Sequence, residues 1–181
     1  NGVRLADVNG DALTDVLRSF DGTKTTWLNT GSGWTASSTW EAPVQFANTG
    51  GSFESMLIDV NGDQLTDVVD AFDTVSATGT PVTYLNNGAG WTASSTWALP
   101  INIIQDGVDN GLRVTDFNGD GLPDLLQAIN GTTTAYVNNG AGWTRSWNWT
   151  SPVSFAGTGY ASTTVTFGTQ LIDVNCDGLA D

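Results

Sequence analysis

The chain has 181 residues and a net charge of −14, from 19 acidic side chains against 5 basic ones, with no histidine. This acidity argues against binding to nucleic acid or an anionic membrane surface, and no apolar run approaches the roughly 20 residues of a membrane span. Without histidine, Ser-His-Asp and Cys-His catalytic arrangements and the usual zinc sites are excluded.

A nine-residue motif with aspartate at both ends appears first at the start of the chain and returns three times. It reads Asp7-Val-Asn-Gly-Asp-Ala-Leu-Thr-Asp15, and its copies begin at Asp59, Asp116 and Asp173. A second segment follows the first three copies, running over Trp27–Trp34, Tyr84–Trp91 and Tyr136–Trp143. Such self-similarity predicts one region of stacked repeats over 1–181. The approximate units are 7–58, 59–115 and 116–172, with a partial fourth unit at 173–181.

Each unit is predicted to be β. Asp15–Phe20 and Thr23–Leu28 have the composition of two strands joined by a glycine turn, and Asn130-Gly131 favours a type I′ hairpin turn. The stretch 163–172 alternates apolar and polar residues. We therefore expect an all-β fold of β-propeller blades with about four antiparallel strands each, in three repeats plus a partial one. Because a propeller needs about 4–8 blades to close, we also expect further repeats in the same chain or in other copies.

The Asp motif has the donor atoms of a calcium site. It places oxygen side chains at positions 1, 3, 5 and 9, and the carbonyl of position 7 can join them, which suits Ca²⁺. Without an ion these carboxylates would repel one another, and no Lys or Arg recurs in the motif. The alternative is a set of solvated Asp/Asn/Gly turns. We expect one Ca²⁺ per loop, up to four. The predicted ligands are Asp7, Asn9, Asp11, Leu13 and Asp15; Asp59, Asn61, Asp63, Leu65 and Asp67; Asp116, Asn118, Asp120, Leu122 and Asp124; and Asp173, Asn175, Asp177, Leu179 and Asp181.

Two other calcium motifs begin in the same way. An EF-hand loop needs a Glu at position 12 and flanking helices, but position 12 here is Arg18, Asp70 or Gln127 and β-like sequence follows. Dockerin modules also need a helix after the loop.

The Asp-x-Asn-Gly-Asp-x-x-x-Asp loop and the segment Tyr84-Leu-Asn-Asn-Gly-Ala-Gly-Trp91 together resemble FG-GAP/VCBS repeats. Such repeats build the integrin α-subunit propeller, several lectin propellers and propeller parts of bacterial Rhs/Tc-type toxins. The sequence Leu28-Asn-Thr-Gly-Ser-Gly-Trp34 is most similar to the bacterial VCBS/Rhs-associated version of the repeat. The resemblance implies calcium in the loop between the first two strands of a blade. Calcium loops themselves favour an extracellular or cell-surface location, where millimolar calcium would saturate weak sites.

Several residues lie outside the loops. Trp34, Trp91 and Trp143 recur and are interpreted as packing residues between blades, whereas Trp147 and Trp149 are candidates for glycan contact. Asn130 and Asn148 begin N-glycosylation sequons. Cys176 is the only cysteine, either a tolerated small residue or a bridge to another chain or to sequence outside these 181 residues.

The leading hypothesis is a non-catalytic, calcium-stabilised extracellular propeller segment that acts in adhesion, protein interaction or extracellular assembly. The alternatives are a carbohydrate-binding, lectin-like propeller and the propeller part of a secreted Rhs/Tc-type toxin. A glycosidase is disfavoured because its paired carboxylates have no counterpart around the isolated Glu41 and Glu54. The protein or glycan ligand is not identified by the sequence.

Overall fold

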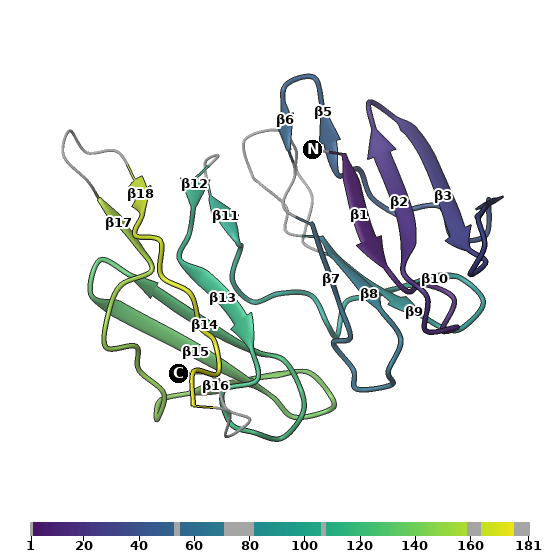
Figure 1. Cartoon of the computed structure of the whole chain (residues 1–181). Helices are drawn as coiled ribbons and strands as arrows, with labels where there is room; N and C mark the ends of the chain where they lie inside the picture. The colour runs from purple at the N-terminus through teal and green to yellow at the C-terminus, as the bar shows by residue number, and fades with distance from the viewer. Residues whose placement is uncertain (1, 53–54, 71–81, 106–107, 159–163, 176–181) are drawn as a thin grey trace. The chain divides into compact units, whose positions relative to one another are not determined.

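The computed structural model describes residues 2–52, 55–70, 82–105, 108–158 and 164–175. All regular structure in these residues is β, which confirms the predicted fold class. The chain divides into two compact units, the first made of 1–72 and 80–99, the second of 73–79 and 100–181 (Figure 1). In the described part of the chain no helix is long and apolar enough to cross a membrane.

The first blade forms one six-stranded sheet in unit 1. Its strands are β1 (Val3–Ala6), β2 (Asp15–Phe20), β3 (Thr23–Asn29), β4 (Trp34–Ser37), β5 (Ala47–Asn48) and β6 (Gly51–Ser52). The order is β4-β3-β2, with β1 antiparallel to β2 and β5 joined to β2 by one parallel pair, Phe20 with Ala47. The turn between β2 and β3 has φ of 47° at Asp21 and 75° at Gly22, the left-handed conformation that such a tight hairpin needs.

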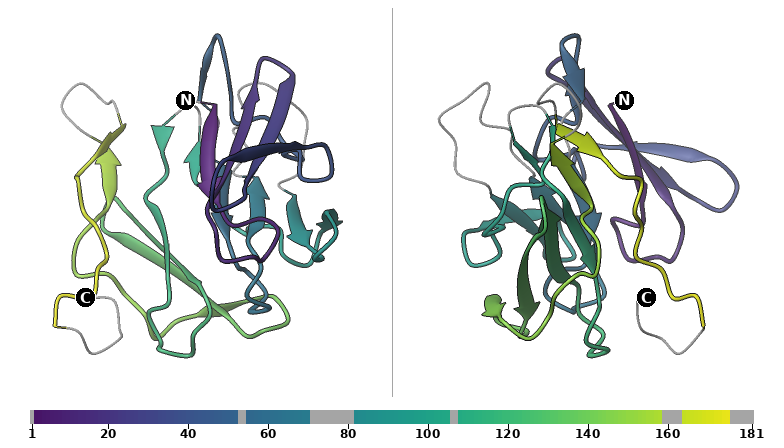
Figure 2. Two further views of the ribbon diagram at one scale, coloured as in Figure 1. Left: turned by 45° about the vertical axis from the view of Figure 1, so that its right-hand side comes forward. Right: turned by 90° about the vertical axis from the view of Figure 1, so that its left-hand side faces the viewer.

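The second blade is a four-stranded sheet in the same unit. Its strands are β7 (Ser55–Ile58), β8 (Asp67–Asp70), β9 (Thr83–Asn86) and β10 (Trp91–Ser94), in the order β10-β9-β8-β7. They are the blue to teal strands of Figure 2. It shares an apolar core with the first blade, in which Val8, Leu17 and Phe46 are fully buried beside Val68. The rings of Trp40 and Trp91 meet edge to face, with centroids 5.5 Å apart. Burial of this apolar surface is what holds the two blades together.

The third blade lies in unit 2. The strands of this unit are β11 (Ile104–Gln105), β12 (Val108–Asp109), β13 (Leu112–Thr115), β14 (Asp124–Ile129), β15 (Thr132–Asn138), β16 (Trp143–Ser146), β17 (Ala156–Thr158) and β18 (Thr164–Thr166). The order β16-β15-β14-β17-β18, with β13 beside β14, repeats the first blade. Phe117, Leu126 and Phe155 form its core, and Leu171 packs against them.

The sequence missed one recurring element, the short hairpin after each outermost strand. β5–β6, β11–β12 and β17–β18 have strands of only two or three residues, too short to show a periodic pattern. In the described part of the stretch 163–172, which was expected to be extended, the strand covers Thr164–Thr166. Asn130 and Gly131 have φ of 49° and 75°, as the predicted turn between β14 and β15 requires.

Candidate metal-binding loops

Each of the first three Asp motifs forms the loop between the first two long strands of its blade. The loops connect β1 to β2, β7 to β8 and β13 to β14. The last Asp of each motif begins the second of these strands. It pairs with the residue before the motif, as in Ala6 with Asp15, Ile58 with Asp67 and Thr115 with Asp124. Both ends of every loop are therefore fixed by a sheet.

The first Asp of the motif holds the loop closed. Oδ1 of Asp7 accepts a hydrogen bond from the Gly10 N–H at 2.8 Å, and Oδ2 accepts one from the Ala12 N–H at 2.7 Å. Asp59 and Asp116 accept the same pairs, all at 2.7 Å. Position 6 has positive φ in every described copy: 66° at Ala12, 70° at Gln64 and 87° at Gly121. The residue at this position is exposed in all three loops, so different residue types can occupy it.

Positions 3 and 5 are joined by their side chains. Nδ2 of Asn9 donates to Oδ2 of Asp11 at 2.9 Å, and Oδ1 of Asp11 accepts from the Leu13 N–H at 2.8 Å. The second and third loops repeat both bonds. The Asp at position 5 is exposed in all three loops. A carboxylate and an amide oxygen are thus held side by side at the surface.

The Asp at position 9 is buried beneath the loop. Asp67 accepts from the Val60 N–H at 2.9 Å through Oδ2 and from the Asn86 N–H at 2.8 Å through Oδ1. Asp15 and Asp124 bond their equivalents in the same way. Burial, which penalises the charged carboxylate, raises the pKa of both Asp67 and Asp124 to about 6. The two backbone bonds oppose this increase in pKa, and the other carboxylates of the same loop add to it.

An asparagine links the first loop to the second. Asn86 ends β9, and its side chain donates to the Val8 carbonyl at 2.8 Å while its own N–H bonds Asp67. Its Oδ1 accepts from the Gly88 N–H at 2.9 Å. No role was predicted for Asn29, Asn86 and Asn138 from the sequence. They recur in the segments Trp27–Trp34, Tyr84–Trp91 and Tyr136–Trp143, and that recurrence was the available signal.

The chemistry of the donor set fits Ca²⁺. Every side chain at positions 1, 3, 5 and 9 offers oxygen, and the rise in pKa that neighbouring carboxylates cause at Asp67 and Asp124 reflects negative charge that a cation would offset. Within the described residues, however, no group of three or more His, Cys, Asp or Glu is placed to hold a metal ion. The carboxylate oxygens of the loops accept hydrogen bonds from backbone N–H groups instead. In the fourth loop Asp173 and Asn175 are exposed, whereas Cys176, Asp177, Leu179 and Asp181 lie outside the described residues.

The two candidate glycan-contact tryptophans differ in their surroundings. Trp147 is 79% exposed, and the Arg145 guanidinium lies 4.2 Å from its ring centroid. Trp149 is 40% exposed and packs on Phe117, with 4.7 Å between centroids. The sequon residues Asn130 and Asn148 are both exposed.

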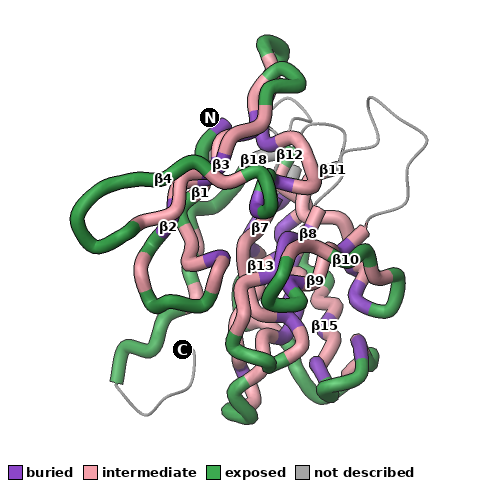
Figure 3. Tube along the Cα trace, turned by 90° about the vertical axis from the view of Figure 1, so that its right-hand side faces the viewer, coloured by how far each residue is buried: buried purple, intermediate pink, exposed green. Residues whose placement is uncertain are grey.

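The recurring tryptophan at the start of the fourth strand has two different environments in unit 1. Trp91 packs against Trp40 of the first blade. Its equivalent Trp34 is 55% exposed, and with Val16 and Trp27 it lines an open apolar pocket of about 260 Å³. The connection that leads into Trp34 is exposed along its whole length (Figure 3). Trp91 therefore packs between the two blades, whereas no neighbouring blade in the described part of the chain covers Trp34.

Comparison with known proteins points to one family. The model of the FG-GAP-like repeat matches residues 59–127 and 116–181. No curated protein sequence matches the chain. Among solved structures, a lectin of Agrocybe aegerita that recognises non-reducing terminal N-acetylglucosamine is similar, with a TM-score of 0.58 and 21% identity, over 78% of this chain and 36% of the lectin. The Tc holotoxin pore of Photorhabdus luminescens has a TM-score of 0.57 and 16% identity, over 99% of this chain and 8% of the toxin chain. At such identities the likeness concerns the fold alone, and this chain spans a minor part of either relative.

Proposed function

Because the chain belongs to the FG-GAP-like repeat family, we propose that it is a non-catalytic, calcium-stabilised segment of an extracellular or cell-surface β-propeller. Its role is adhesion, protein interaction or extracellular assembly. The observation that supports calcium is the repetition of one oxygen-rich, hydrogen-bonded loop in three blades, with the same side chains at positions 1, 3, 5 and 9. Nucleic acid and membrane insertion are not part of the proposal, given the charge of −14.

In the proposed state, Asp7, Asn9 and Asp11 and the Leu13 carbonyl hold one Ca²⁺ with Asp15, and the other loops do the same. The ion supplies positive charge to a loop that has three carboxylates. Asp15 is already buried and bonded to two backbone N–H groups, so it anchors the loop to β2 whether or not an ion is present.

Calcium removal tests this part of the proposal. A ligand at 100 times its dissociation constant stabilises a fold by about 2.7 kcal/mol per site. We expect excess EGTA to lower the melting temperature and added Ca²⁺ to restore it. The triple variant Asp11→Asn, Asp63→Asn, Asp120→Asn should lose most of this response, whereas Asp21→Asn, in an exposed turn outside the loops, should keep it. If excess EGTA does not change the melting temperature of the wild-type chain, the calcium proposal is contradicted.

The uncovered face of the first blade supports assembly. The second blade packs against the first through Val68, Tyr84 and Trp91. The equivalent residues of the first blade line the open pocket, and they are Val16, Trp27 and Trp34. We propose that a blade of another copy of this chain covers Val16, Trp27 and Trp34 in the same way. Light scattering should then show association that increases with concentration. Trp34→Arg should abolish it, and Trp147→Arg, which changes an exposed tryptophan elsewhere, should leave it intact. A wild-type chain that stays monomeric at all concentrations contradicts this contact.

A lectin-like role is the second candidate, and the exposed Trp147 with Arg145 over its ring favours it. Aromatic faces stack on sugar rings, and a lectin shares the fold. Binding on a glycan array that Trp147→Ala removes would support this role, while silence across a broad array would rule it out. The propeller part of a secreted Rhs/Tc-type toxin is a further alternative. The amino-acid sequence of the repeats and the fold shared with the Tc toxin support it.

A further inference from the structure

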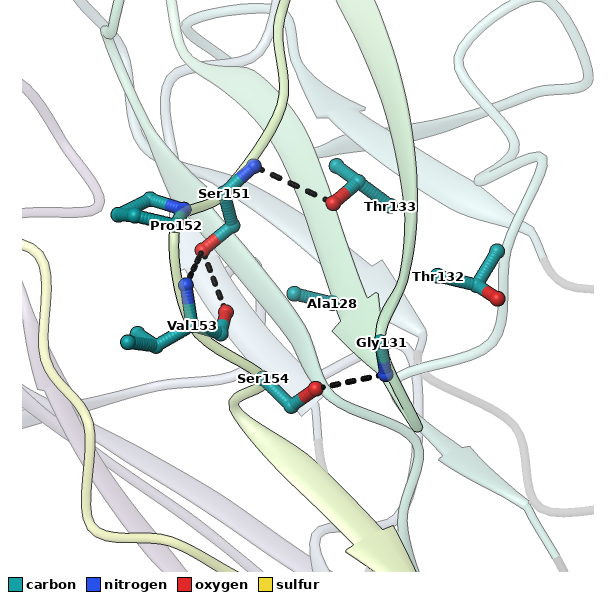
Figure 4. A pocket seen from close by; sticks show the side chains of 8 residues that line it. All are labelled: Ala128, Gly131, Thr132, Thr133, Ser151, Pro152, Val153 and Ser154. Carbon is teal, nitrogen blue, oxygen red and sulfur yellow. Dashed lines mark hydrogen bonds between the residues drawn. The ribbon is translucent and has the colours of Figure 1, made fainter.

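Unit 2 contains a small polar pocket outside the Asp loops. It has a volume of about 170 Å³ and lies between the turn that joins β14 to β15 and the segment 151–154 (Figure 4). Side chains of Thr132, Thr133, Ser151 and Ser154 line it together with Pro152. Its polar atoms are therefore hydroxyl and backbone groups, and none of its lining residues carries a charged side chain.

The first blade has a lysine at the same place. Lys24 pairs with Ser19 across the β2–β3 hairpin, and Thr133 pairs with Ala128 across the β14–β15 hairpin. The following segments are also anchored alike, by Phe46 N–H to Ser19 O at 3.2 Å and by Phe155 N–H to Ala128 O at 2.8 Å. Lys24 and Thr133 thus occupy equivalent backbone positions, and so do Pro43 and Pro152.

The lysine of the first blade shows what this backbone can bind. Nζ of Lys24 donates a hydrogen bond of 3.0 Å to the Pro43 carbonyl, and the side chain is partly buried. In the third blade the much shorter Thr133 stands there, and its Oγ1 accepts from the Ser151 N–H at 3.2 Å. The ammonium group that fills this place in the first blade has no counterpart in the side chain of Thr133.

The remaining polar atoms hold the pocket in shape. Ser151 Oγ donates to the Val153 carbonyl at 2.6 Å, and Ser154 Oγ accepts from the Gly131 N–H at 2.8 Å (Figure 4). The segment 151–154 is thereby tied both to itself and to the β14–β15 turn. A ligand would meet oxygen atoms that are already positioned, which reduces the entropy lost on binding.

We propose that this pocket binds the ammonium end of a lysine side chain from a partner protein, with the Pro152 carbonyl as an acceptor, as Pro43 is for Lys24. A chain with a net charge of −14 attracts basic partners, and the ligand supplies the only formal charge in the pocket. The proposal rests on the protein-interaction role given above, but it depends neither on calcium nor on contacts between copies.

A matched pair of small probes tests the proposal in the full chain. Nα-acetyl-lysine N-methylamide carries the ammonium group, and Nα-acetyl-norleucine N-methylamide has an aliphatic side chain without it. In amide NMR titrations we expect saturable shifts at Gly131, Ser151 and Val153 with the lysine probe, in the millimolar range. The norleucine probe should leave these amides unchanged. Equal shifts with both probes, or no shift with either, would overturn the proposal.

Two reciprocal variants make the test independent of any one substitution. Thr133→Lys places the first blade's own lysine in the pocket and should abolish the lysine-probe shifts. Lys24→Thr should create a matching site in the first blade, with new shifts at Gly22, Ala42 and Val44. If a folded Thr133→Lys variant still shows the lysine-probe shift at Gly131, the proposed lysine site is contradicted. A folded Lys24→Thr variant without new shifts would also contradict it.

Discussion

The side-chain amide of Asn86 donates a hydrogen bond of 2.8 Å to the carbonyl of Val8, which joins the end of β9 to the Asp loop of the neighbouring blade. Asn86 is 1% exposed, and its own N–H bonds the buried Asp67. One residue therefore connects two candidate calcium loops through a chain of hydrogen bonds. Such buried polar links are expensive to break because the partner left behind has no water to bond.

Replacement of Asn86 tests this connection. Asn86→Ala should lower the free energy of unfolding by about 1–3 kcal/mol, since the Val8 carbonyl and the Gly88 N–H lose their partner. Asn29→Ala is the matched control. Asn29 occupies the same place in the first blade, but its side chain bonds the Thr14 carbonyl of its own blade at 3.2 Å, in an exposed setting. Urea unfolding of both variants should show the larger loss for Asn86, and equal losses would contradict a special role.

In two blades a threonine hydroxyl bonds the backbone carbonyl of a buried tryptophan. Thr83 Oγ1 donates to the Trp97 carbonyl at 2.7 Å, as Thr26 does to the Trp40 carbonyl, and these tryptophans are 5% and 6% exposed. The third blade has Ala135 at this position, and its Trp149 is 40% exposed.

We therefore expect Thr83→Ala to lower the free energy of unfolding by about 1 kcal/mol in chemical denaturation. The reverse change, Ala135→Thr, should restore the bond in the third blade and shield Trp149. Acrylamide quenching reports this shielding when Trp149→Phe is used in parallel to identify the signal of Trp149. If Ala135→Thr does not change the quenching of Trp149, the hydroxyl does not shield this tryptophan.

The pH dependence of stability should reveal the half-buried carboxyl group of Asp70. Burial raises the pKa of Asp70, so the folded chain holds this proton more tightly than the unfolded chain does. As the pH rises past the unfolded value of about 3.9, ionisation in the unfolded chain draws the equilibrium towards unfolding, until Asp70 is ionised in the folded chain as well. The isosteric Asp70→Asn lacks this penalty.

Melting temperatures between pH 3.5 and pH 8 should therefore show little difference between wild type and Asp70→Asn at the acidic end. The advantage of the variant should grow as the pH rises and then level off. Asp21→Asn, which alters an exposed turn aspartate, serves as the control. A variant that is less stable than wild type at neutral pH would show that the charged Asp70 is stabilised by a partner rather than penalised by burial.

Local sequence was sufficient to predict the β class, the hairpin turns and the Asp loops. A loop such as Asp7–Asp15 closes through bonds between residues two to seven positions apart, so its nine residues largely determine its shape. The same holds for the Asn130-Gly131 turn, where two positive φ angles are enough. Short strands such as β5 and β17 escaped prediction because two or three residues have no measurable period and depend on a single contact with β2 or β14.

The sequence by itself therefore determined the repeat, its β character and the oxygen-rich loops, since these depend on neighbours in the chain. Only the tertiary structure decided which copies of a repeated residue are covered and which are free. Trp34 and Trp91 occupy equivalent positions of the repeat, yet Trp91 packs against the first blade and Trp34 is exposed. Lys24 and Thr133 occupy one backbone position, yet the lysine reaches a carbonyl and the threonine lines a pocket. Burial depends on contacts between residues far apart in the chain, which a repeated local pattern cannot encode.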